Sequence, residues 1–298
     1  MSAYRIDHVQ VRRAFARAAA SYEQNDSLQR TVQSRLLERL DYHEGAPQCV
    51  LDVGCGTGRG AAILKRRWPQ ARVLALDIAL PMLQRARRHG GWMKPFERVC
   101  ADALQLPLSD RSVDVLHSNL CIQWFEDPLP LFTEFARVLK PDGFLALTTL
   151  GPDTLRELRH AWAEADDMHS KIGHPHVGRF LDMHDLGDVA IAAGLRDPVL
   201  DVDHLQSRYE SPRDLLRELK GLGATNADAQ RERGLTGKTR FARMLQAYEA
   251  MRVDGCVPAT WEVVEMHAWG PPEGQPRRIG GEEIATFPIE RLRGSRRG

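Results

Sequence analysis

The sequence lacks any long uninterrupted hydrophobic run. A membrane-spanning helix needs about 18 consecutive apolar residues, and no such stretch occurs in the 298 residues. The amino-terminal segment MSAYRIDHVQVRRAF also lacks the apolar core that a secretory signal peptide requires. Both absences argue against membrane insertion and secretion, and we expect a cytoplasmic protein.

Cysteine is scarce, and its distribution argues against two kinds of site. The chain has five cysteines, an odd number, without the spacing of a disulfide framework or a zinc ribbon. Cys55 lies in a glycine-rich turn, where a small side chain that simply fits is favoured over a nucleophile. His174 and His176 are the closest pair of possible metal ligands, two residues apart beside a proline. The sequence therefore predicts reduced thiols and no metal centre.

An excess of charge of one sign is also lacking. The 41 basic residues are balanced by 40 acidic residues, so the chain has no strong field of the kind that general nucleic-acid binding uses. We expect neither a nucleic acid nor a membrane as partner. With 43% hydrophobic residues, a chain of this length has ample apolar side chains for a buried core.

What the sequence does contain is an alternation of short apolar runs and helix-like segments. Strands are predicted over 48–53, 72–77, 97–101, 113–119 and 144–150. Helices are predicted over 60–68, 81–89 and 131–139. Such alternation is typical of a parallel sheet with helices on both faces, and we predict a doubly wound α/β core.

The same patterns divide the chain into segments. Residues 1–44 are predicted to hold two helices interrupted near 21–26, and residues 45–150 form the core. A mainly helical elaboration over the ligand edge of the sheet is predicted for 151–258, with helices over 154–165, 183–193, 212–220 and 238–252 and an extended run over 199–205. A late sheet strand follows at 259–270, and the Pro, Gly and Arg content of 271–298 predicts a disordered tail.

A glycine-rich turn, LDVGCGTG, follows the first predicted strand. Gly54, Gly56 and Gly58 stand where a strand must turn sharply into a helix, and glycine allows a ligand to approach the backbone closely there. The spacing departs from the nicotinamide fingerprint. Asp52, two residues before the first glycine, would repel a pyrophosphate but suits an ammonium group, such as that of S-adenosylmethionine.

Polar residues end the next three predicted strands as well. Asp77 ends the second strand, where a carboxylate can accept both hydroxyls of a ribose. Asp102 and Ala103 end the third and are candidates to contact an adenine ring. Ser118 and Asn119 end the fourth. Because the carboxyl ends of parallel strands open into one crevice, this ordered set predicts a single nucleoside-containing ligand.

These residues resemble the class I methyltransferase family, whose members share the Asp-x-Gly-x-Gly-x-Gly turn and an acid at the end of the second strand. That resemblance covers about residues 45–150. A closer one, to the malonyl-acyl-carrier-protein O-methyltransferase family of biotin synthesis, reaches nearly the whole chain before the tail. The segments that carry it include SNLCIQW at 118–124, GPDTL at 151–155, HVGRF at 176–180, LKGLGATN at 219–226 and WEVV at 261–264.

The resemblance implies a mostly parallel seven-stranded sheet and an enzyme that uses S-adenosylmethionine and no metal. The implied reaction transfers a methyl group to the free carboxyl of a malonyl thioester on acyl carrier protein. A malonyl carboxylate is ionised at neutral pH, so this reaction needs no general base. The protein has to align the reactants and exclude water instead.

Several site residues follow from the resemblance. Tyr22 is expected in a lid over the methyl group, and Gln123 is expected to border the transfer site. His176 and Arg179 are the candidates for binding the substrate carboxylate, although each also has an ordinary structural interpretation. Gln29 and Ile78 join the cofactor-binding residues named above.

Carrier proteins are acidic, so their docking face should be basic. Arg217, Lys220, Lys238 and Arg240 supply positive charge in the predicted elaboration, and we expect them to meet the carrier protein. Charged runs of this kind are also common as solvated helix faces.

Three other functions remain open on the sequence alone. A related branch of the fold contains arginine hydroxylases that assist complex I assembly, and fold-level similarity does not distinguish the two reactions. A noncatalytic assembly factor that keeps the cofactor fold is a second alternative. A methyltransferase that acts on another small organic acid or a quinone is a third.

Overall fold

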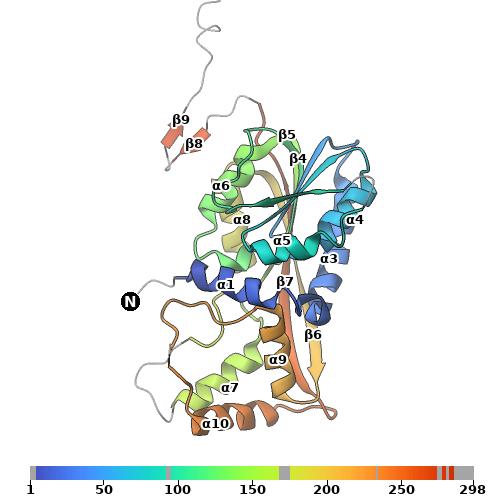
Figure 1. The fold of residues 1–298 in the computed structure, drawn as a ribbon. Coiled ribbons are helices and arrows are strands. Elements are labelled where there is room, and N and C mark those ends of the chain that lie inside the picture. The colour runs from blue at the N-terminus through green and yellow to red at the C-terminus, as the bar shows by residue number, and fades with distance from the viewer. Residues whose placement is uncertain are drawn as a thin grey trace, which may run out of the picture.

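The chain folds around one seven-stranded sheet (Figure 1). The computed structural model describes residues 5–91, 95–167, 175–232, 234–273, 277–279 and 282–284. The strands of the sheet are β1 (Cys49–Val53), β2 (Arg72–Asp77), β3 (Glu97–Cys100), β4 (Val113–Asn119), β5 (Leu139–Leu150), β6 (Arg196–Tyr209) and β7 (Val257–Trp269). Their spatial order is β3-β2-β1-β4-β5-β7-β6. The first five are parallel, and β7 runs antiparallel to both β5 and β6. The predicted mostly parallel, seven-stranded α/β fold is confirmed.

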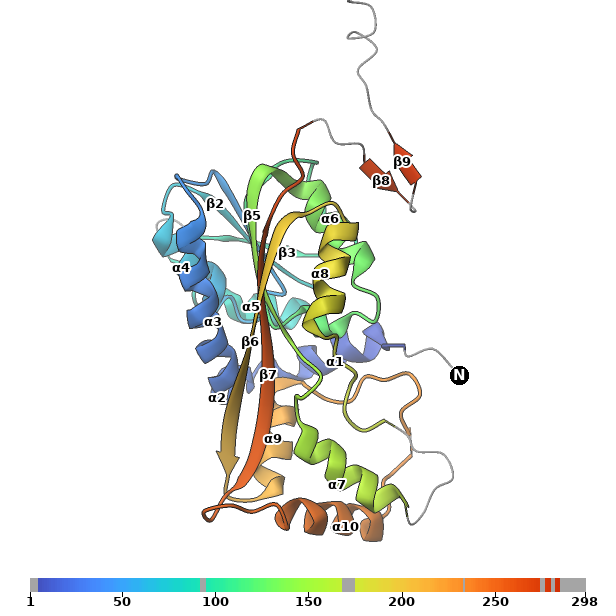
Figure 2. The same ribbon diagram turned by 180° about the vertical axis from the view of Figure 1, so that it is seen from behind.

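Helices cover both faces of the sheet (Figure 2). They are α1 (His8–Ala18), α2 (Tyr22–Asn25), α3 (Ser27–Arg39), α4 (Arg59–Arg67), α5 (Leu80–Ala86), α6 (Leu129–Val138), α7 (Arg156–Asp167), α8 (Met183–Ala192), α9 (Pro212–Leu222) and α10 (Lys238–Glu249), with short 3-10 helices η1 (Leu40–Tyr42) and η2 (Ile122–Trp124). Within the described residues, no helix is both long enough and apolar enough to cross a bilayer.

The alternation of side chains along each strand divides the core into two layers. On β1, Val50 packs with the apolar residues of α3 and α4, whereas Leu51 and Val53 pack with those of α6 and α8. This is the two-residue period of a strand that is buried on both faces. The same parity places Asp52 on the side of α3 and α4.

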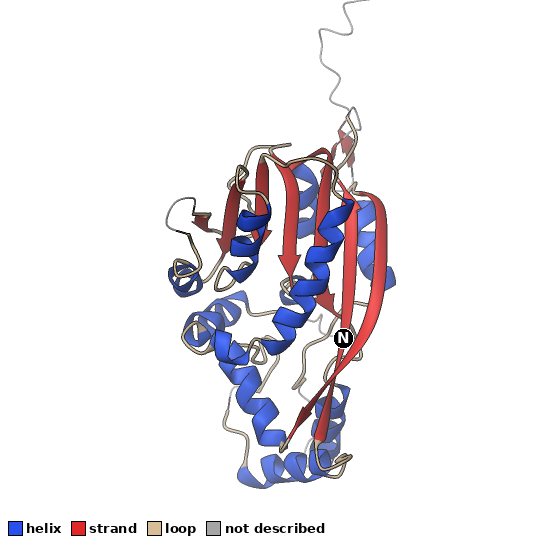
Figure 3. Ribbon diagram, turned by 90° about the vertical axis from the view of Figure 1, so that its right-hand side faces the viewer, coloured by secondary structure: helices blue, strands red, loops and turns tan. Residues whose placement is uncertain are grey.

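A third hydrophobic cluster lies beyond the ends of the parallel strands. The long strands β6 and β7 run past the other strands into a lower layer that α7, α9 and α10 complete (Figure 3). Trp162, Tyr248 and Trp261 lie at the centre of this layer, and the Tyr248 hydroxyl donates to the Pro258 carbonyl at 2.9 Å. The elaboration predicted as mainly helical is therefore built on two strands of the main sheet, and its extended segment is longer than the expected 199–205.

Three boundaries differ from the sequence prediction. The break expected between the first two helices contains a further short helix, α2. The turn expected before residue 144 is included in β5, which begins at Leu139 and is irregular opposite β4. The range predicted as a disordered tail contains two short paired strands, β8 (Arg277–Ile279) and β9 (Glu282–Ile284). Residues 274–276, 280–281 and 285–298 of that range lie outside the described residues.

Candidate functional site

Two adjoining cavities open at the carboxyl ends of the parallel strands. The first, of about 770 Å³ including its open mouth, is lined by residues that follow β1, β2, β3 and β4. The second, of about 1000 Å³ on the same measure, lies between α9, the start of α7 and the loop 224–228. Phe15, Tyr22, Leu120 and Trp124 line both cavities and so form the wall between them. Below, the first is called the cofactor cavity and the second the substrate cavity.

The turn after β1 forms the floor of the cofactor cavity through Gly54 and Gly56. Both glycines have positive φ angles, 68° and 53°, which other residues adopt only with strain. A Cβ atom on Gly54 would lie 2.4 Å from the Cys121 sulfur, so glycine is required there on steric grounds as well. The predicted close approach of backbone to ligand at these two positions agrees with the geometry.

Asp77 is the charged group at the centre of the cofactor cavity. Its two carboxylate oxygens accept hydrogen bonds from the backbone N–H groups of Gly56, at 2.9 Å, and Ala79, at 2.7 Å. Burial raises the pKa of Asp77 to about 6, although both hydrogen bonds act in the opposite direction. Each oxygen keeps a further lone pair, which suits a ligand with two neighbouring hydroxyl groups.

The far end of this cavity is formed by Ile78, Asp102 and Ala103. One carboxylate oxygen of Asp102 accepts the Leu104 N–H at 3.0 Å, which fixes the side chain in a turn beside the cavity. A carboxylate that can accept from an amino group, beside an apolar side chain and a small residue, suits a purine ring. The residues present therefore fit the nucleoside part of S-adenosylmethionine.

Three predicted cofactor ligands lie outside this cavity. Asp52 is buried under α4, and its carboxylate pairs with Nδ1 of His117 at 2.8 Å. Gly58 caps α4 with a φ of 80°, and a Cβ there would lie 2.6 Å from that of Ala86. The hydroxyl of Ser118 donates to the Val53 carbonyl in the core. These three residues therefore do not line the cofactor cavity and lie behind the turn; their contact with the cofactor stays a prediction.

Asn119 and Gln29 connect the two cavities. Asn119 lines the cofactor cavity, but its amide donates to the Gln29 carbonyl at 3.1 Å and accepts from the Thr148 hydroxyl at 2.9 Å. Gln29 lines the substrate cavity instead of the cofactor cavity. Its assignment as a cofactor ligand therefore does not match its position.

The amino-terminal segment covers the cofactor cavity. His8, Val11, Phe15 and Tyr22 line it from α1 and α2. The segment around Tyr22 that was predicted as a lid therefore lines this cavity together with three residues of α1.

Loop 226–231, beside the substrate cavity, holds this lid closed. The backbone N–H of Asp7 donates to the Ala227 carbonyl at 2.8 Å, and the Asp7 carboxylate pairs with Arg231 at 3.2 Å. A second backbone hydrogen bond joins the N–H of Ala229 to the Arg5 carbonyl at 2.8 Å. The cover of one cavity is therefore fastened to the wall of the other.

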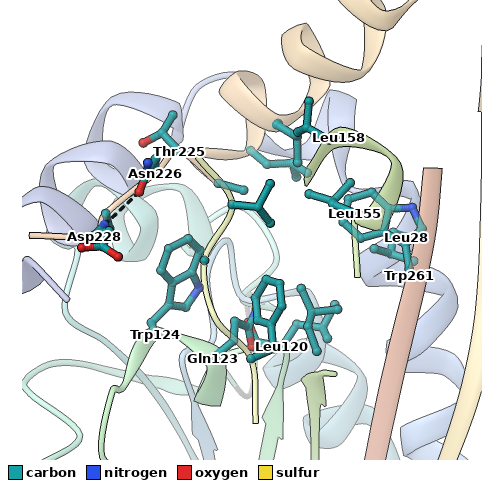
Figure 4. Close-up of a pocket in the computed structure, with 18 of the residues that line it drawn as sticks. Leu28, Leu120, Gln123, Trp124, Leu155, Leu158, Thr225, Asn226, Asp228 and Trp261 are labelled. Carbon is teal, nitrogen blue, oxygen red and sulfur yellow. Dashed lines mark hydrogen bonds between the residues drawn. The ribbon is translucent and has the colours of Figure 1, made fainter. Parts of the chain in front are cut away.

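The substrate cavity is largely apolar (Figure 4). Leu28, Leu155, Leu158 and Trp261 form one side, and Trp124 projects from the opposite side next to Gln123. Gln123 lines this cavity as predicted. Its side-chain amide is already hydrogen-bonded. The amide nitrogen donates to the Leu120 carbonyl at 2.8 Å, and the amide oxygen accepts from the Thr149 hydroxyl at 3.5 Å.

His176 also lines the substrate cavity, held by a buried polar network. Its ring stacks on Trp162 at 3.8 Å, and its Nε2 lies 3.1 Å from both Asp166 and Arg240. Arg240 donates to Asp166 at 2.6 Å and also contacts Glu232. Burial lowers the pKa of His176. Arg240 is therefore not available for carrier docking as predicted, since its side chain is only 13% exposed and holds His176 in place.

Arg179 takes a different position from the one expected. Its neighbours Gly178 and Phe180 line the substrate cavity, whereas Arg179 is exposed and lines neither cavity. His174, the other half of the pair considered as metal ligands, lies outside the described residues.

Two groups were not anticipated from the sequence. Cys121 lines the cofactor cavity, where burial raises the pKa of its thiol to about 12 and so keeps it protonated. Asp153, His204 and Glu262 bring possible metal-ligand atoms within 4.8 Å of one another, outside both cavities. The Glu262 carboxylate accepts the Asp153 N–H at 2.6 Å, and Asp153 also faces His204 at 3.5 Å. These contacts account for the three side chains without an ion.

Residues 51–147 match the family model described as a methyltransferase domain. A protein of Xylella fastidiosa named malonyl-[acyl-carrier protein] O-methyltransferase is 45% identical over 289 residues, which is 96% of each chain. A protein of the same name from Gallionella capsiferriformans is 46% identical over 277 residues, 91% of this chain and 93% of the relative.

Solved structures resemble the fold at lower identity. The YcgJ protein of Bacillus subtilis aligns with a TM-score of 0.56 at 17% identity, over 79% of this chain and 97% of that protein. Phosphoethanolamine N-methyltransferase 2 of Haemonchus contortus, solved with S-adenosyl-L-methionine, aligns with a TM-score of 0.51 at 17% identity, over 85% of this chain and 56% of that protein. At such identities the likeness shows the fold alone. The similarity at 45% and 46% identity extends over nearly the whole length, and the chain belongs to the family of malonyl-[acyl-carrier protein] O-methyltransferases, which are S-adenosylmethionine-dependent enzymes.

Proposed function

We propose that this chain transfers a methyl group from S-adenosylmethionine to the free carboxyl of a malonyl thioester on acyl carrier protein. The product, a malonyl-acyl-carrier-protein methyl ester, would enter pimeloyl formation in biotin synthesis. The observation that carries this proposal is the pair of cavities that share one wall. A cavity that carries Asp77 and Asp102 suits the cofactor, and a largely apolar one beside it suits an acyl thioester and its uncharged ester product.

The residues of the cofactor cavity have distinct tasks in this proposal. Asp77 would accept the ribose hydroxyls, and Asp102 with Ala103 would face the adenine. The amides of the turn at Gly54 and Gly56 would lie against the remainder of the cofactor. When bound, S-adenosylmethionine supplies a methyl group on a positively charged sulfur.

The other residues act by placing the acceptor and excluding water. A carboxylate that is already ionised needs no proton removed, and among the described residues lining both cavities we assign none as a general base. Phe15, Leu120 and Trp124 close the shared wall with apolar surface. Such a wall favours transfer between the two substrates and disfavours attack by water.

The carrier protein would dock on the exposed side of α9. Arg217 is 72% exposed in its side chain and, among the residues that the structure describes, pairs only with Asp214 one turn earlier; Lys220 is exposed on the same helix. Leu219 and Leu222 of that helix line the substrate cavity from its other side. A thioester arm that enters beside α9 would therefore start from a basic surface, which suits an acidic partner.

The test is intact mass spectrometry of malonyl-acyl-carrier protein incubated with the protein and S-adenosylmethionine. We expect a gain of one methyl group, lost with Asp77→Ala and retained with Asp41→Ala, a change of an exposed acid in η1. No gain, despite measurable cofactor binding, would contradict the proposal. A gain of one oxygen on an arginine of another protein would favour the hydroxylase alternative.

A further inference from the structure

The substrate cavity has no lysine or arginine among its described lining residues. Its titratable residues are Tyr22, His176 and Asp228. Burial lowers the pKa of His176, so its ring is uncharged at neutral pH, and Asp228 is itself an acid. Arg179 is exposed outside the cavity. Among the described lining residues, a substrate carboxylate would therefore meet none of the cations that usually bind such a group.

Uncharged donors stand at the wall that the two cavities share. Tyr22 and Trp124 line both cavities, and Gln29 lines the substrate cavity. Within the described part of the chain, the Tyr22 hydroxyl, the Trp124 indole N–H and the Gln29 side-chain amide form no hydrogen bond, and Oε1 of Gln29 is buried without a partner. Buried polar groups are normally paired, so the buried, unpaired Oε1 of Gln29 indicates that this amide is available to a ligand, together with the donors of Tyr22 and Trp124 that line the same cavity.

Two other amides of the cavity are already paired, whereas the Thr225 hydroxyl is, like Oε1 of Gln29, buried without a partner among the described residues. Gln123 bonds to Leu120 and Thr149, and the Asn226 amide donates to the Pro175 carbonyl at 2.6 Å. Of the three unpaired groups, those of Trp124 and Tyr22 are also held in position. Phe15 meets Trp124 edge to face at 5.2 Å, and the Tyr22 ring lies against the glycine turn, 3.9 Å from where a Cβ of Gly56 would be. These two donors are therefore fixed before any ligand binds.

We propose that Tyr22, Gln29 and Trp124 form an uncharged receptor for the substrate carboxylate, so that the positive charge this carboxylate meets is that of the methyl donor. This inference rests on the proposed function and deepens it. In the transfer, a carboxylate oxygen forms a bond to the methyl carbon and the carbon–sulfur bond breaks with its electron pair on sulfur. No proton moves, and the negative and positive charges disappear together.

A receptor that has no positively charged side chain suits a reaction in which the substrate carboxylate loses its charge. An arginine paired with the carboxylate would keep its charge after the ester formed and would be left buried and unpaired, which is costly. Neutral donors accept both the charged substrate and the uncharged product. Two opposite charges a few ångströms apart in a cavity of low dielectric attract strongly. Substrate affinity should therefore depend on the charge of whatever occupies the cofactor cavity.

The test measures binding of malonyl-acyl-carrier protein by titration calorimetry to the protein saturated with one of two cofactor analogues. S-adenosylhomocysteine has a neutral sulfur, and sinefungin carries a protonated amine in place of the sulfonium methyl and transfers nothing. We expect binding at least about tenfold tighter with sinefungin. The methyl ester of the same malonyl carrier protein should bind both complexes with affinities within about twofold.

Variants test the receptor itself. Tyr22→Phe, Gln29→Leu and Trp124→Phe should each weaken binding of malonyl-acyl-carrier protein to the sinefungin complex severalfold and weaken binding of its methyl ester less. Tyr42→Phe, at an exposed tyrosine in η1, is the matched control. Equal affinity in the two complexes, with methyl transfer intact, would overturn the inference alone. Absence of both binding and methyl transfer would overturn the proposed function together with it.

Discussion

At the scale of single residues, Asp77 makes cofactor binding sensitive to pH. Its pKa is raised to about 6 by burial, so the carboxylate that would accept the ribose hydroxyls becomes protonated just below neutral pH. We expect the dissociation constant for S-adenosylmethionine to rise about tenfold between pH 7.5 and pH 5. Titration calorimetry across this range checks it, and Asp77→Asn should bind weakly with little pH dependence. An unchanged affinity at pH 5 would remove Asp77 from the site.

The same raised pKa of Asp77 acts in the opposite direction on the stability of the cofactor-free protein. Cofactor affinity falls as the pH is lowered, whereas the free energy of unfolding rises. Because the folded-state pKa lies above the ordinary value of 3.8, the folded state disfavours the charged carboxylate. The resulting loss of stability is complete above about pH 6 and is relieved as the pH falls toward 3.8. At about 1.4 kcal/mol per pKa unit, the cost at neutral pH is about 3 kcal/mol. Urea unfolding without cofactor should show Asp77→Asn to be more stable than the unchanged protein at pH 7.5 and equal to it near pH 4.

Gly58 illustrates a residue that belongs to the motif but acts through packing. Its φ of 80° and its contact with α5 both disfavour a side chain, whereas Gly45 has a similar φ of 91° with nothing within 4 Å of a Cβ. We expect Gly45→Ala to cost about 1 kcal/mol of unfolding free energy from backbone strain alone. Gly58→Ala should cost about 3 kcal/mol, because the clash with Ala86 adds to it. Equal losses in urea unfolding would mean that α5 moves away freely.

The positions of the predicted acids show which side chains can be located from one sequence and which cannot. Asp77 and Asp102 were found because they end strands, and the carboxyl ends of parallel strands share one edge. Asp52 belongs to the glycine-rich motif, but it lies inside β1. There it is in register with His117 on β4. Residues in register point to the same face, so the two side chains meet under α4. His117 lies 65 residues later in the chain, and no local pattern connects it to Asp52.

At the scale of elements, α1 is a cover whose fastening can be weakened. The pair between Asp7 and Arg231 joins the start of α1 to the wall of the substrate cavity, and both side chains are partly buried. Loss of such a pair costs about 0.5–1 kcal/mol, so Arg231→Ala should release bound cofactor about two- to fivefold faster. Stopped-flow displacement measures this. Arg208→Ala, which removes an exposed arginine of β6, should leave the rate unchanged, and an unaltered rate in Arg231→Ala would mean that α1 does not gate release.

Helices and strands whose apolar residues follow a clear pattern were predicted well from the sequence. Those that depend on pairing with segments far along the chain were not. β2 and β4 were placed correctly over 72–77 and 113–119, because each contains a short run of buried apolar residues. β6 was recognised only in part, since its alternating polar residues at the edge of the sheet give a weak signal. Nothing in residues 151–258 indicated that this strand would pair with β7 and carry the lower helical layer. The two cavities likewise depend on residues from opposite ends of the chain.

At the scale of the whole molecule, balanced charge does not exclude a local basic docking face on α9. Arg217 and Lys220 are exposed there, and the same helix supplies Leu219 and Leu222 to the substrate cavity. We expect Arg217→Glu combined with Lys220→Glu to raise KM for malonyl-acyl-carrier protein about tenfold and to leave KM for malonyl-coenzyme A nearly unchanged. The effect should shrink at high salt, because exposed charges are screened.

The matched control for this prediction is Arg98→Glu on β3, at the opposite edge of the sheet from the lower layer. It changes the net charge by the same amount per residue without touching α9, so it separates a local docking effect from a general one. Steady-state kinetics with both substrates compare the two variants. Arg98→Glu reverses one charge and the α9 variant reverses two. If Arg98→Glu raised KM for the carrier-protein substrate as much per reversed charge, the net charge of the whole molecule would explain the effect. If neither variant changed KM, the carrier protein would approach the substrate cavity from a face other than α9.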